Sequence, residues 1–204
     1  MLLCNYVECS VKSDVVFVID SSISVTKQDF EKAKKFIHNF TESLSTDGNK
    51  VGVIVFETTA RNPLPLENIT VDNKGEILQT INNISHVQGL TNTADGLCKL
   101  TQQNWRRNNF GVLKVAIVLT DGNPYGSQNS MDCGGNTEHV IKSLRTNYSD
   151  ILIFAVGIGS SEFYTELSLI ASKPHLISAL QNYSDRELSI LNGGLRYQIC
   201  YTRI

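Results

Sequence analysis

The stretch VVFVIDSSISV, residues 15–25, runs as a buried strand would and then breaks into one carboxylate and three hydroxyls. Two later turns, Gly89-Leu-Thr-Asn92 and Thr120-Asp-Gly122, present further side chains of the same kind. The side chains in these segments whose polar atoms are all oxygen include Asp20, Ser22, Ser24, Thr91 and Asp121. Hard oxygen ligands without thiolate or imidazole suit Mg²⁺, Mn²⁺ or Ca²⁺. The residue types therefore predict a site for a divalent cation.

The spacing of the hydroxyls supports this interpretation. Ser22 and Ser24 lie two residues apart, which lets a tight loop aim both hydroxyls at one point. Neutral hydroxyls compensate little of a cation's charge, so the cation would attract an anion from outside. Taken singly, each serine or Thr91 is more simply a helix cap, and Asp121 before a glycine is a common turn former. The metal site is favoured because all three segments lie in strand-end contexts and are expected at one edge of the fold.

Apolar runs and helical periodicity indicate the elements that would position these side chains. The run from residue 14 to 19 is apolar on both faces, as in a central parallel strand covered by helices. Further strands are predicted over residues 50–56, 113–119, 151–156 and 175–180, and residues 60–66, which contain two prolines, are predicted as an edge strand or an extended segment. Helices are predicted from a Thr26 cap to residue 44, and over 73–84, 93–105, 134–145, 162–171 and 185–197.

Strands and helices alternate throughout, which predicts an α/β fold: a three-layer, doubly wound, mostly parallel sheet with helices on both faces. Ligands of such sheets bind beyond the carboxyl ends of the strands, where the three polar segments would converge. No linker or repeat interrupts the pattern. We therefore expect one domain over residues 13–204, preceded by an N-terminal segment, residues 1–12, that carries two cysteines.

Composition excludes several classes of partner. The chain has 18 basic and 20 acidic residues, so it lacks the positive charge that binds nucleic acid or an anionic membrane. No apolar run approaches the roughly 20 residues needed to span a bilayer, so direct membrane insertion is not expected. The apolar start, Met1 to Leu3, is too short for a signal peptide, so we expect a mature region or an excised domain.

Cysteines and sequons indicate an extracellular protein. Of five cysteines, Cys200 is expected to pair with Cys4 or Cys9, and Cys98 with Cys133 as a weaker second pairing, which leaves one thiol able to link another chain. Five triplets fit the N-glycosylation pattern, at Asn39, Asn68, Asn83, Asn147 and Asn182. Beside the terminal cysteines, they favour a secreted protein or the ectodomain of a cell-surface protein.

The motif residues resemble a known family. Asp20-Ser-Ser-Ile-Ser24, Thr91 and Thr120-Asp-Gly122 are similar to the metal-ion-dependent adhesion site (MIDAS) of von Willebrand factor A and integrin inserted domains. The similarity extends from residue 13 to about residue 200 and includes Val156-Gly-Ile-Gly159. It implies a six-stranded sheet with one short antiparallel edge strand, and a complete site in which Ser22 and Ser24 coordinate Mg²⁺.

The resemblance also implies roles and a mechanism. Thr91 would join the cation when ligand binds, Asp20 and Asp121 would act largely through water, and a carboxylate of a partner protein would complete the coordination. The segment 122–135 is longer than usual for such a connection and should lie beside the metal. We predict a ligand-contacting rim of Ser21, Asn92, Asn123 and Tyr125. In some family members the last helix moves, and Gly193-Gly194 could ease that motion or a Cys200 disulfide restrain it.

These features predict a non-catalytic adhesion or matrix-interaction module, binding collagen or another matrix or cell-surface glycoprotein. The alternative is a structural module that polymerises through disulfides or homotypic contacts, with little regulated binding. A metal-dependent hydrolase is disfavoured because no His or Glu falls at the matching strand ends to act as general base. Neither GxGxxG, a Walker lysine nor GxSxG is present, which disfavours nucleotide-binding enzymes and serine esterases.

Overall fold

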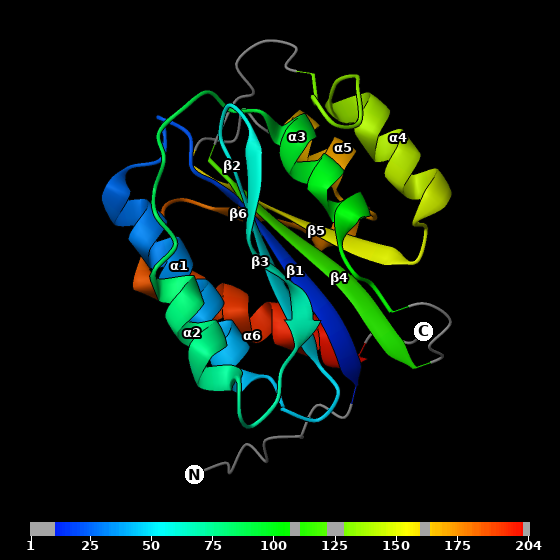
Figure 1. Cartoon of the computed structure of the whole chain (residues 1–204). Helices are drawn as coiled ribbons and strands as arrows, with labels where there is room; N and C mark the ends of the chain where they lie inside the picture. The colour runs from blue at the N-terminus through cyan, green and yellow to red at the C-terminus, as the bar shows by residue number, and fades with distance from the viewer. Residues whose placement is uncertain (1–10, 107–110, 122–128, 160–163, 202–204) are drawn as a thin grey trace.

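Six strands form one sheet in the order β3-β2-β1-β4-β5-β6 in the computed structural model, which describes residues 11–106, 111–121, 129–159 and 164–201 (Figure 1). The strands are β1 (Lys12–Asp20), β2 (Lys50–Phe56), β3 (Ala60–Asn68), β4 (Val112–Thr120), β5 (Ile151–Ile158) and β6 (Ile177–Leu180). All neighbouring pairs are parallel except β2 and β3. The predicted mostly parallel sheet with an antiparallel edge strand is confirmed.

Helices cover both faces of this sheet (Figure 1). One layer holds α1 (Lys27–Ser43), α2 (Lys74–Asn82) and α6 (Asp185–Tyr201), and the other holds α3 (Thr93–Cys98), α4 (Thr137–Asn147) and α5 (Tyr164–Ile170). Thr26 caps α1 as predicted, because its side chain accepts a hydrogen bond from the Asp29 N–H. No helix in the described ranges combines the length and the apolar composition that a membrane span requires.

The central strand β1 is buried on both faces, which explains the uninterrupted apolar run over residues 15–19. Toward α1, the ring of Phe17 packs edge-on against Phe36 and Phe40, with centroid distances of 6.0 and 5.3 Å. Such edge-to-face pairs add to the stabilisation that burial of the rings provides. The core therefore fixes β1 firmly, and with it the position of whatever follows its last residue.

Strand register brings the polar segments to one edge. Asp20, the last residue of β1, lies opposite Phe56 at the end of β2, and the preceding Ile19 lies opposite Leu119 near the end of β4. Parallel pairing without a shift means that the three strands end at the same level. The loops that follow them must therefore meet, as the sequence predicted.

The predicted helix over 93–105 is shorter in the structure. α3 ends at Cys98, a 3₁₀ turn covers Lys99–Gln102, and the chain is extended from Gln103. The reason is that Trp105 is buried and its indole N–H donates to the Leu100 carbonyl at 2.7 Å. A continued helix could not make this contact.

Two other helix boundaries differ from prediction. α4 begins at Thr137 rather than residue 134 because Gly134 and Gly135 have positive φ angles of 63° and 79°, which a right-handed helix cannot accommodate. At the other end of the chain, α6 continues through the glycine pair to Tyr201, four residues beyond the predicted end. Before β6, Pro174–Leu176 forms a 3₁₀ turn, so the strand begins at Ile177.

Gly96 yields a prediction about how α3 is held against the sheet. A Cβ atom at this position would lie 2.8 Å from Cδ1 of the buried Phe56 ring, closer than carbon atoms pack. We expect Gly96→Ala to lower the free energy of unfolding by about 1–3 kcal/mol because α3 must move away from β2. Urea denaturation of the purified chain measures this change.

Gly75→Ala in α2 is the matched control, since a Cβ there has no heavy atom within 4 Å. The control should be neutral or stabilising by up to about 1 kcal/mol, because alanine costs less entropy than glycine in a helix. Equal effects of the two substitutions would mean that the contact of Gly96 with Phe56 does not limit how closely α3 approaches.

Candidate metal centre

Four of the five predicted cation ligands form one hydrogen-bonded series at the carboxyl end of β1. The Asp20 carboxylate accepts hydrogen bonds from the Ser22 N–H and the Thr120 hydroxyl, both at 2.8 Å. The Ser22 and Ser24 hydroxyls lie 2.9 Å apart, and Ser24 donates to Oδ1 of Asp121 at 2.9 Å. Residues about a hundred positions apart in the chain are thereby brought into one cluster of oxygen atoms.

The two carboxylates of this cluster are destabilised in their charged forms. Burial raises the pKa of Asp20 from 3.8 to about 6; hydrogen bonds from Ser22 and Thr120 oppose the rise, and the charge of Asp121 adds to it. Burial also raises the pKa of Asp121, opposed by the hydrogen bond from Ser24. A positive charge between the two carboxylates would stabilise their ionised forms and lower both pKa values.

The loop that carries Thr91 reaches the same edge. The Ile23 N–H donates to the Gly89 carbonyl at 2.9 Å, and the Asn92 N–H donates to the Glu57 carbonyl at 2.8 Å. Thr91, between the two anchored residues, is buried. The fifth predicted ligand is therefore held in a loop that is hydrogen-bonded to the segment between Ser22 and Ser24.

Ser21, which was predicted to contact ligand, is fully buried. Its hydroxyl donates to the Val87 carbonyl at 3.0 Å and accepts from the Val87 N–H at 2.9 Å. These two bonds tie the loop after β1 to the segment that precedes Thr91. Ser21 thus joins two loops in the interior beside the site and does not form part of its exposed surface.

Asn92, also predicted at the rim, is buried as well. Its side-chain oxygen caps α3 by accepting from the Asp95 N–H at 3.1 Å, and its amide donates to the carbonyls of Thr58 and Asn129 at 3.1 and 3.3 Å. One side chain therefore joins three loops. The other two predicted rim residues, Asn123 and Tyr125, lie outside the described residues.

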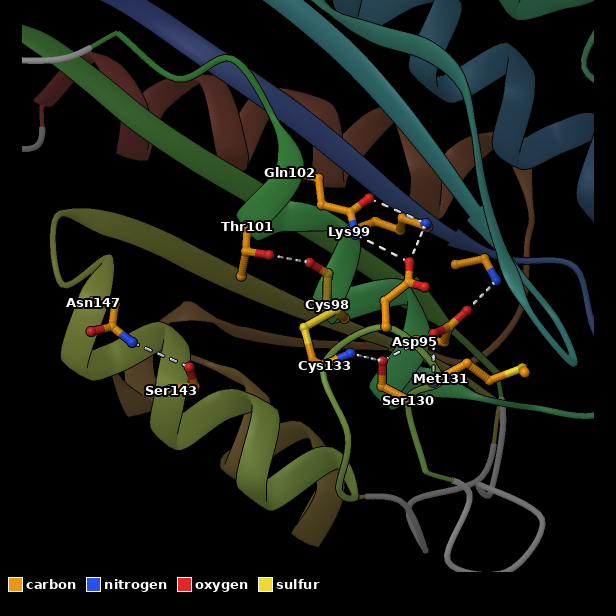
Figure 2. Close-up of a disulfide and its surroundings, with 12 residues drawn as sticks. Asp95, Cys98, Lys99, Thr101, Gln102, Ser130, Met131, Cys133, Ser143 and Asn147 are labelled. Atoms are coloured by element: carbon orange, nitrogen blue, oxygen red, sulfur yellow. Dashed lines mark hydrogen bonds and ion pairs between the residues drawn. A yellow bond between two sulfur atoms is a disulfide. The ribbon is translucent and has the colours of Figure 1, made fainter.

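A second buried carboxylate, Asp95, holds the loops beside the cluster together (Figure 2). Its Oδ2 accepts from the Ala60 N–H at 2.6 Å, and its Oδ1 accepts from the Ser130 hydroxyl and the Met131 N–H at 3.0 and 3.2 Å. The first turn of α3, the start of β3 and the segment after β4 converge on this one residue. Asp95 is thus a structural residue rather than a solvated one.

The Cys98–Cys133 disulfide reinforces the same junction (Figure 2). It joins the end of α3 to the segment between β4 and α4, with a Cα–Cα distance of 5.9 Å. This predicted pairing is confirmed. Cys200 is also disulfide-bonded, and its predicted partners Cys4 and Cys9 lie outside the described residues.

Two buried groups near the cluster were missed by the sequence analysis. Both carboxylate oxygens of Glu166 are buried, and neither has a hydrogen-bond partner in the part of the chain that the structure describes. Burial raises the pKa of Glu166 to about 7; the nearby Thr93 hydroxyl opposes this and the charge of Asp20 adds to it. Burial, with the charges of Asp121 and Asp20, also raises the pKa of Tyr183 well above 10.0. In the sequence, Glu166 resembles any acidic residue of a first helical turn.

Apolar side chains, also missed, are exposed on the loops around the cluster. Ile23 is 72% exposed although it lies between two predicted cation ligands, and Leu90 precedes a third with 40% exposure. Val87 and Met131 are exposed on the adjoining segments. We call these four residues the apolar rim. An isoleucine between two serines was the available signal for it.

The donor set fits a hard divalent cation. Among the described residues, no group of three or more His, Cys, Asp and Glu side chains is arranged to hold a metal. The candidate centre differs from such groups because it has two carboxylates and depends otherwise on hydroxyls. Oxygen-only donors of this kind match Mg²⁺, Mn²⁺ or Ca²⁺, and a cation there would favour the charged form of both carboxylates, whose pKa values burial raises.

The chain matches the family model of the von Willebrand factor type A domain over residues 14–191. It therefore belongs to this family, as the motifs predicted. The six-stranded, mostly parallel sheet with helices on both faces agrees with this membership.

Its relatives include matrix proteins. Matrilin-1 from Gallus gallus is 34% identical over 177 residues, covering 81% of this chain and 33% of that protein. The collagen alpha-4(VI) chain from Mus musculus is 28% identical over 205 residues, covering 95% of this chain and 8% of that one. This chain thus spans a third or less of each relative's length.

Among solved structures, proximal thread matrix protein 1 from the mussel byssus is similar, with a TM-score of 0.76 and 25% identity. The similarity covers 94% of this chain and 47% of that one. Relatives of this kind agree with the expected extracellular location and with the expectation of a non-enzymatic domain.

Asp20 generates a prediction about pH. Its folded-state pKa of about 6 lies above the ordinary value of 3.8, so the folded chain binds this proton more tightly than the unfolded chain. The cation-free domain therefore loses stability as the pH rises from about 4 to about 6, and cation binding, which needs the carboxylate ionised, weakens below about pH 6. We expect Mg²⁺ to raise the melting temperature at about pH 7.5 and to have little effect at about pH 5.

Thermal unfolding with Mg²⁺ or EDTA across this pH range measures the effect. Asp20→Asn is the control, because it keeps the side-chain shape and removes the titrating group. A Mg²⁺-dependent shift of the same size at both pH values would contradict the assignment of Asp20 to the centre.

The disulfide generates a second prediction. Replacing Cys98 and Cys133 together by alanine opens a ring with a sequence separation of 35 residues. We expect the free energy of unfolding to fall by about 2–4 kcal/mol, since the unfolded chain gains conformational freedom. Urea denaturation measures this. The double variant is preferable to a reducing agent, which would also break the bond of Cys200; an unchanged transition midpoint would contradict the prediction.

Proposed function

We propose that this domain binds an extracellular matrix protein through a divalent cation held by Asp20, Ser22, Ser24, Thr91 and Asp121. The observation that carries the proposal is the hydrogen-bonded series from Asp20 through both serines to Asp121. It gathers the oxygen atoms that a hard cation needs at an edge of the sheet where a partner can reach them. A bound cation would supply a Lewis-acidic position for a carboxylate of the ligand.

The position of each residue supports a specific role at the proposed cation site. Ser22 and Ser24 offer neutral hydroxyl ligands, and Ser24 is exposed enough to face a partner. Asp20 is buried and oriented by Thr120, so it balances charge from the protein side. Asp121, half-buried, stands opposite it across the hydroxyls.

Mg²⁺ is the proposed cation, with Mn²⁺ or Ca²⁺ as substitutes. One structure of the mussel thread matrix protein, with a TM-score of 0.77 and 25% identity to this chain, is described as having a zinc-occupied MIDAS motif. That finding belongs to the mussel protein. It supports the proposal that the equivalent edge of this domain accepts a divalent ion.

The apolar rim suggests what surrounds the ligand's carboxylate. Ile23 and Leu90 are exposed on the two loops that contain proposed cation ligands. Removal of such side chains from water stabilises a complex by roughly 25 cal/mol per Å². A partner segment with an apolar side chain near an acidic one would therefore bind better than an acidic segment alone. Collagens and other matrix glycoproteins are the proposed partners.

A structural module remains a second candidate, and the cysteines favour it. Cys98, Cys133 and Cys200 are all disulfide-bonded. If Cys200 pairs with Cys4 or Cys9 as the sequence predicts, the other of these two is left able to join a second chain.

The five predicted glycosylation sites are all exposed, so burial excludes none of them: Asn39, Asn68, Asn83, Asn147 and Asn182.

Asp121→Asn tests the adhesion mechanism. The substitution removes one negative charge from the centre while keeping the side-chain shape. We expect Mg²⁺-dependent binding to immobilised collagens and matrix proteins to weaken at least about tenfold, with little change in melting temperature. Surface plasmon resonance in Mg²⁺ and in EDTA measures the binding.

Asp47→Asn is the matched control, because Asp47 is a surface carboxylate that pairs with Lys12. It should bind like the wild type. Binding that persists in EDTA and in the Asp121→Asn variant would reject the cation mechanism and favour the structural module.

A further inference from the structure

The last helix, α6, presents two apolar faces, and one of them is used inside the domain. Its inner face consists of four buried residues: Leu188, Leu191, Leu195 and Ile199. On its outer face, Ile190, Tyr197 and Tyr201 are 66%, 63% and 54% exposed. The rings of the two tyrosines contact each other, with their centroids 4.4 Å apart. An apolar strip on a helix that is already anchored by its other face indicates a contact with another molecule.

Gly193 and Gly194 lie in the middle of this outer strip. A glycine inside a helix costs roughly 0.5–1 kcal/mol relative to alanine, so a pair of them needs a reason. Among the described residues, a Cβ atom at either position would have no heavy atom within 4 Å, and neither glycine has a positive φ angle. Packing within the described part of the chain therefore does not require them. Two adjacent residues without side chains on an exposed face do allow another backbone to come close.

The outer strip is symmetric about the Gly193–Gly194 peptide bond. Ile190 and Tyr197 stand at equal distances along the chain from this bond, and so do Arg186 and Tyr201. All are exposed, and their spacing of three or four residues places them on one face of the helix. A second α6, packed antiparallel, would therefore set Ile190 opposite Tyr197 and Arg186 opposite Tyr201 at both ends.

We propose that α6 is a self-association surface, on which a second copy of this chain packs its own α6 antiparallel about a two-fold axis at the Gly193–Gly194 bond. Such an interface is isologous, because each helix offers the same strip to the other. The glycines permit a close crossing, the apolar side chains are removed from water, and each arginine lies against a tyrosine ring, an attractive pairing. A partner of a different sequence would not need exposed positions that are spaced equally on both sides of the Gly193–Gly194 bond.

The contact is smaller than a standard stable interface, so the dimer should be weak and depend on concentration. Sedimentation equilibrium of the 204-residue chain measures this. We expect Ile190→Asp to weaken association at least about tenfold, and Tyr197→Lys to do the same, because each places a charge against an apolar side chain. Val71→Asp is the matched control: Val71 is 81% exposed, outside α6, and its replacement should leave association unchanged.

The proposed pairing of Ile190 with Tyr197 can be tested directly by mixing two variants. In an equimolar mixture of Ile190→Asp and Tyr197→Lys chains, the heterodimer pairs aspartate with lysine at one end and keeps the original contact at the other. We therefore expect the mixture to recover association that neither variant shows alone. A double Gly193→Ala, Gly194→Ala variant should weaken the dimer while keeping or raising the melting temperature of the monomer.

Three results would overturn the proposal: a wild-type chain that stays monomeric at about 1 mM, variants that associate like the wild type, or a mixture without recovery. Because α6 and the candidate metal centre involve different residues, association in EDTA should equal association in Mg²⁺. Failure here would leave the proposed cation mechanism untouched, and failure of that mechanism would leave this proposal standing.

Discussion

The Asp20 carboxylate is buried at the end of the central strand, and the arrangement of the surrounding loops depends on how its charge is satisfied. Hydrogen bonds from the Ser22 N–H and the Thr120 hydroxyl hold it in place. They compensate burial only in part, since the pKa of Asp20 is still raised to about 6. Such a charge is costly unless a counter-charge is present. The burial of Asp20 at this strand end is consistent with a site in which a cation, bound from outside the polypeptide, balances the charge of the carboxylate.

Much of this arrangement could be predicted from the sequence because it follows from strand topology. Parallel strands that end at one level bring their loops together, so an apolar run before Asp20 and another before Asp121 were sufficient to predict their meeting. The fold class and the Cys98–Cys133 pairing were predicted for similarly general reasons, whereas the antiparallel edge strand was implied by the family resemblance. Family motifs then indicated which of the oxygen atoms belong together.

Tertiary contacts decided what the sequence could not. Ser21 and Asn92 carry polar groups beside predicted ligands, and polarity alone suggested a surface role; in the structure both are buried because neighbouring loops need their hydrogen bonds. The exposed side chains at this edge, such as Ile23, are apolar instead. The carboxylate oxygens of Glu166 in α5 are buried near Thr93 of α3, a neighbour distant in sequence that no local pattern reports.

The Cys98–Cys133 bond has a mechanical consequence. It closes a covalent ring that runs from the end of α3 through all of β4 to Cys133, which precedes α4. A fully extended residue spans at most about 3.6 Å, so a ring with a sequence separation of 35 withholds on the order of 120 Å of contour length from any force applied outside it. In a chain whose Cys200 bond is open, tension at the two ends would lengthen the segments outside this ring, while the strand that ends next to Asp121 remains within a loop that tension cannot straighten.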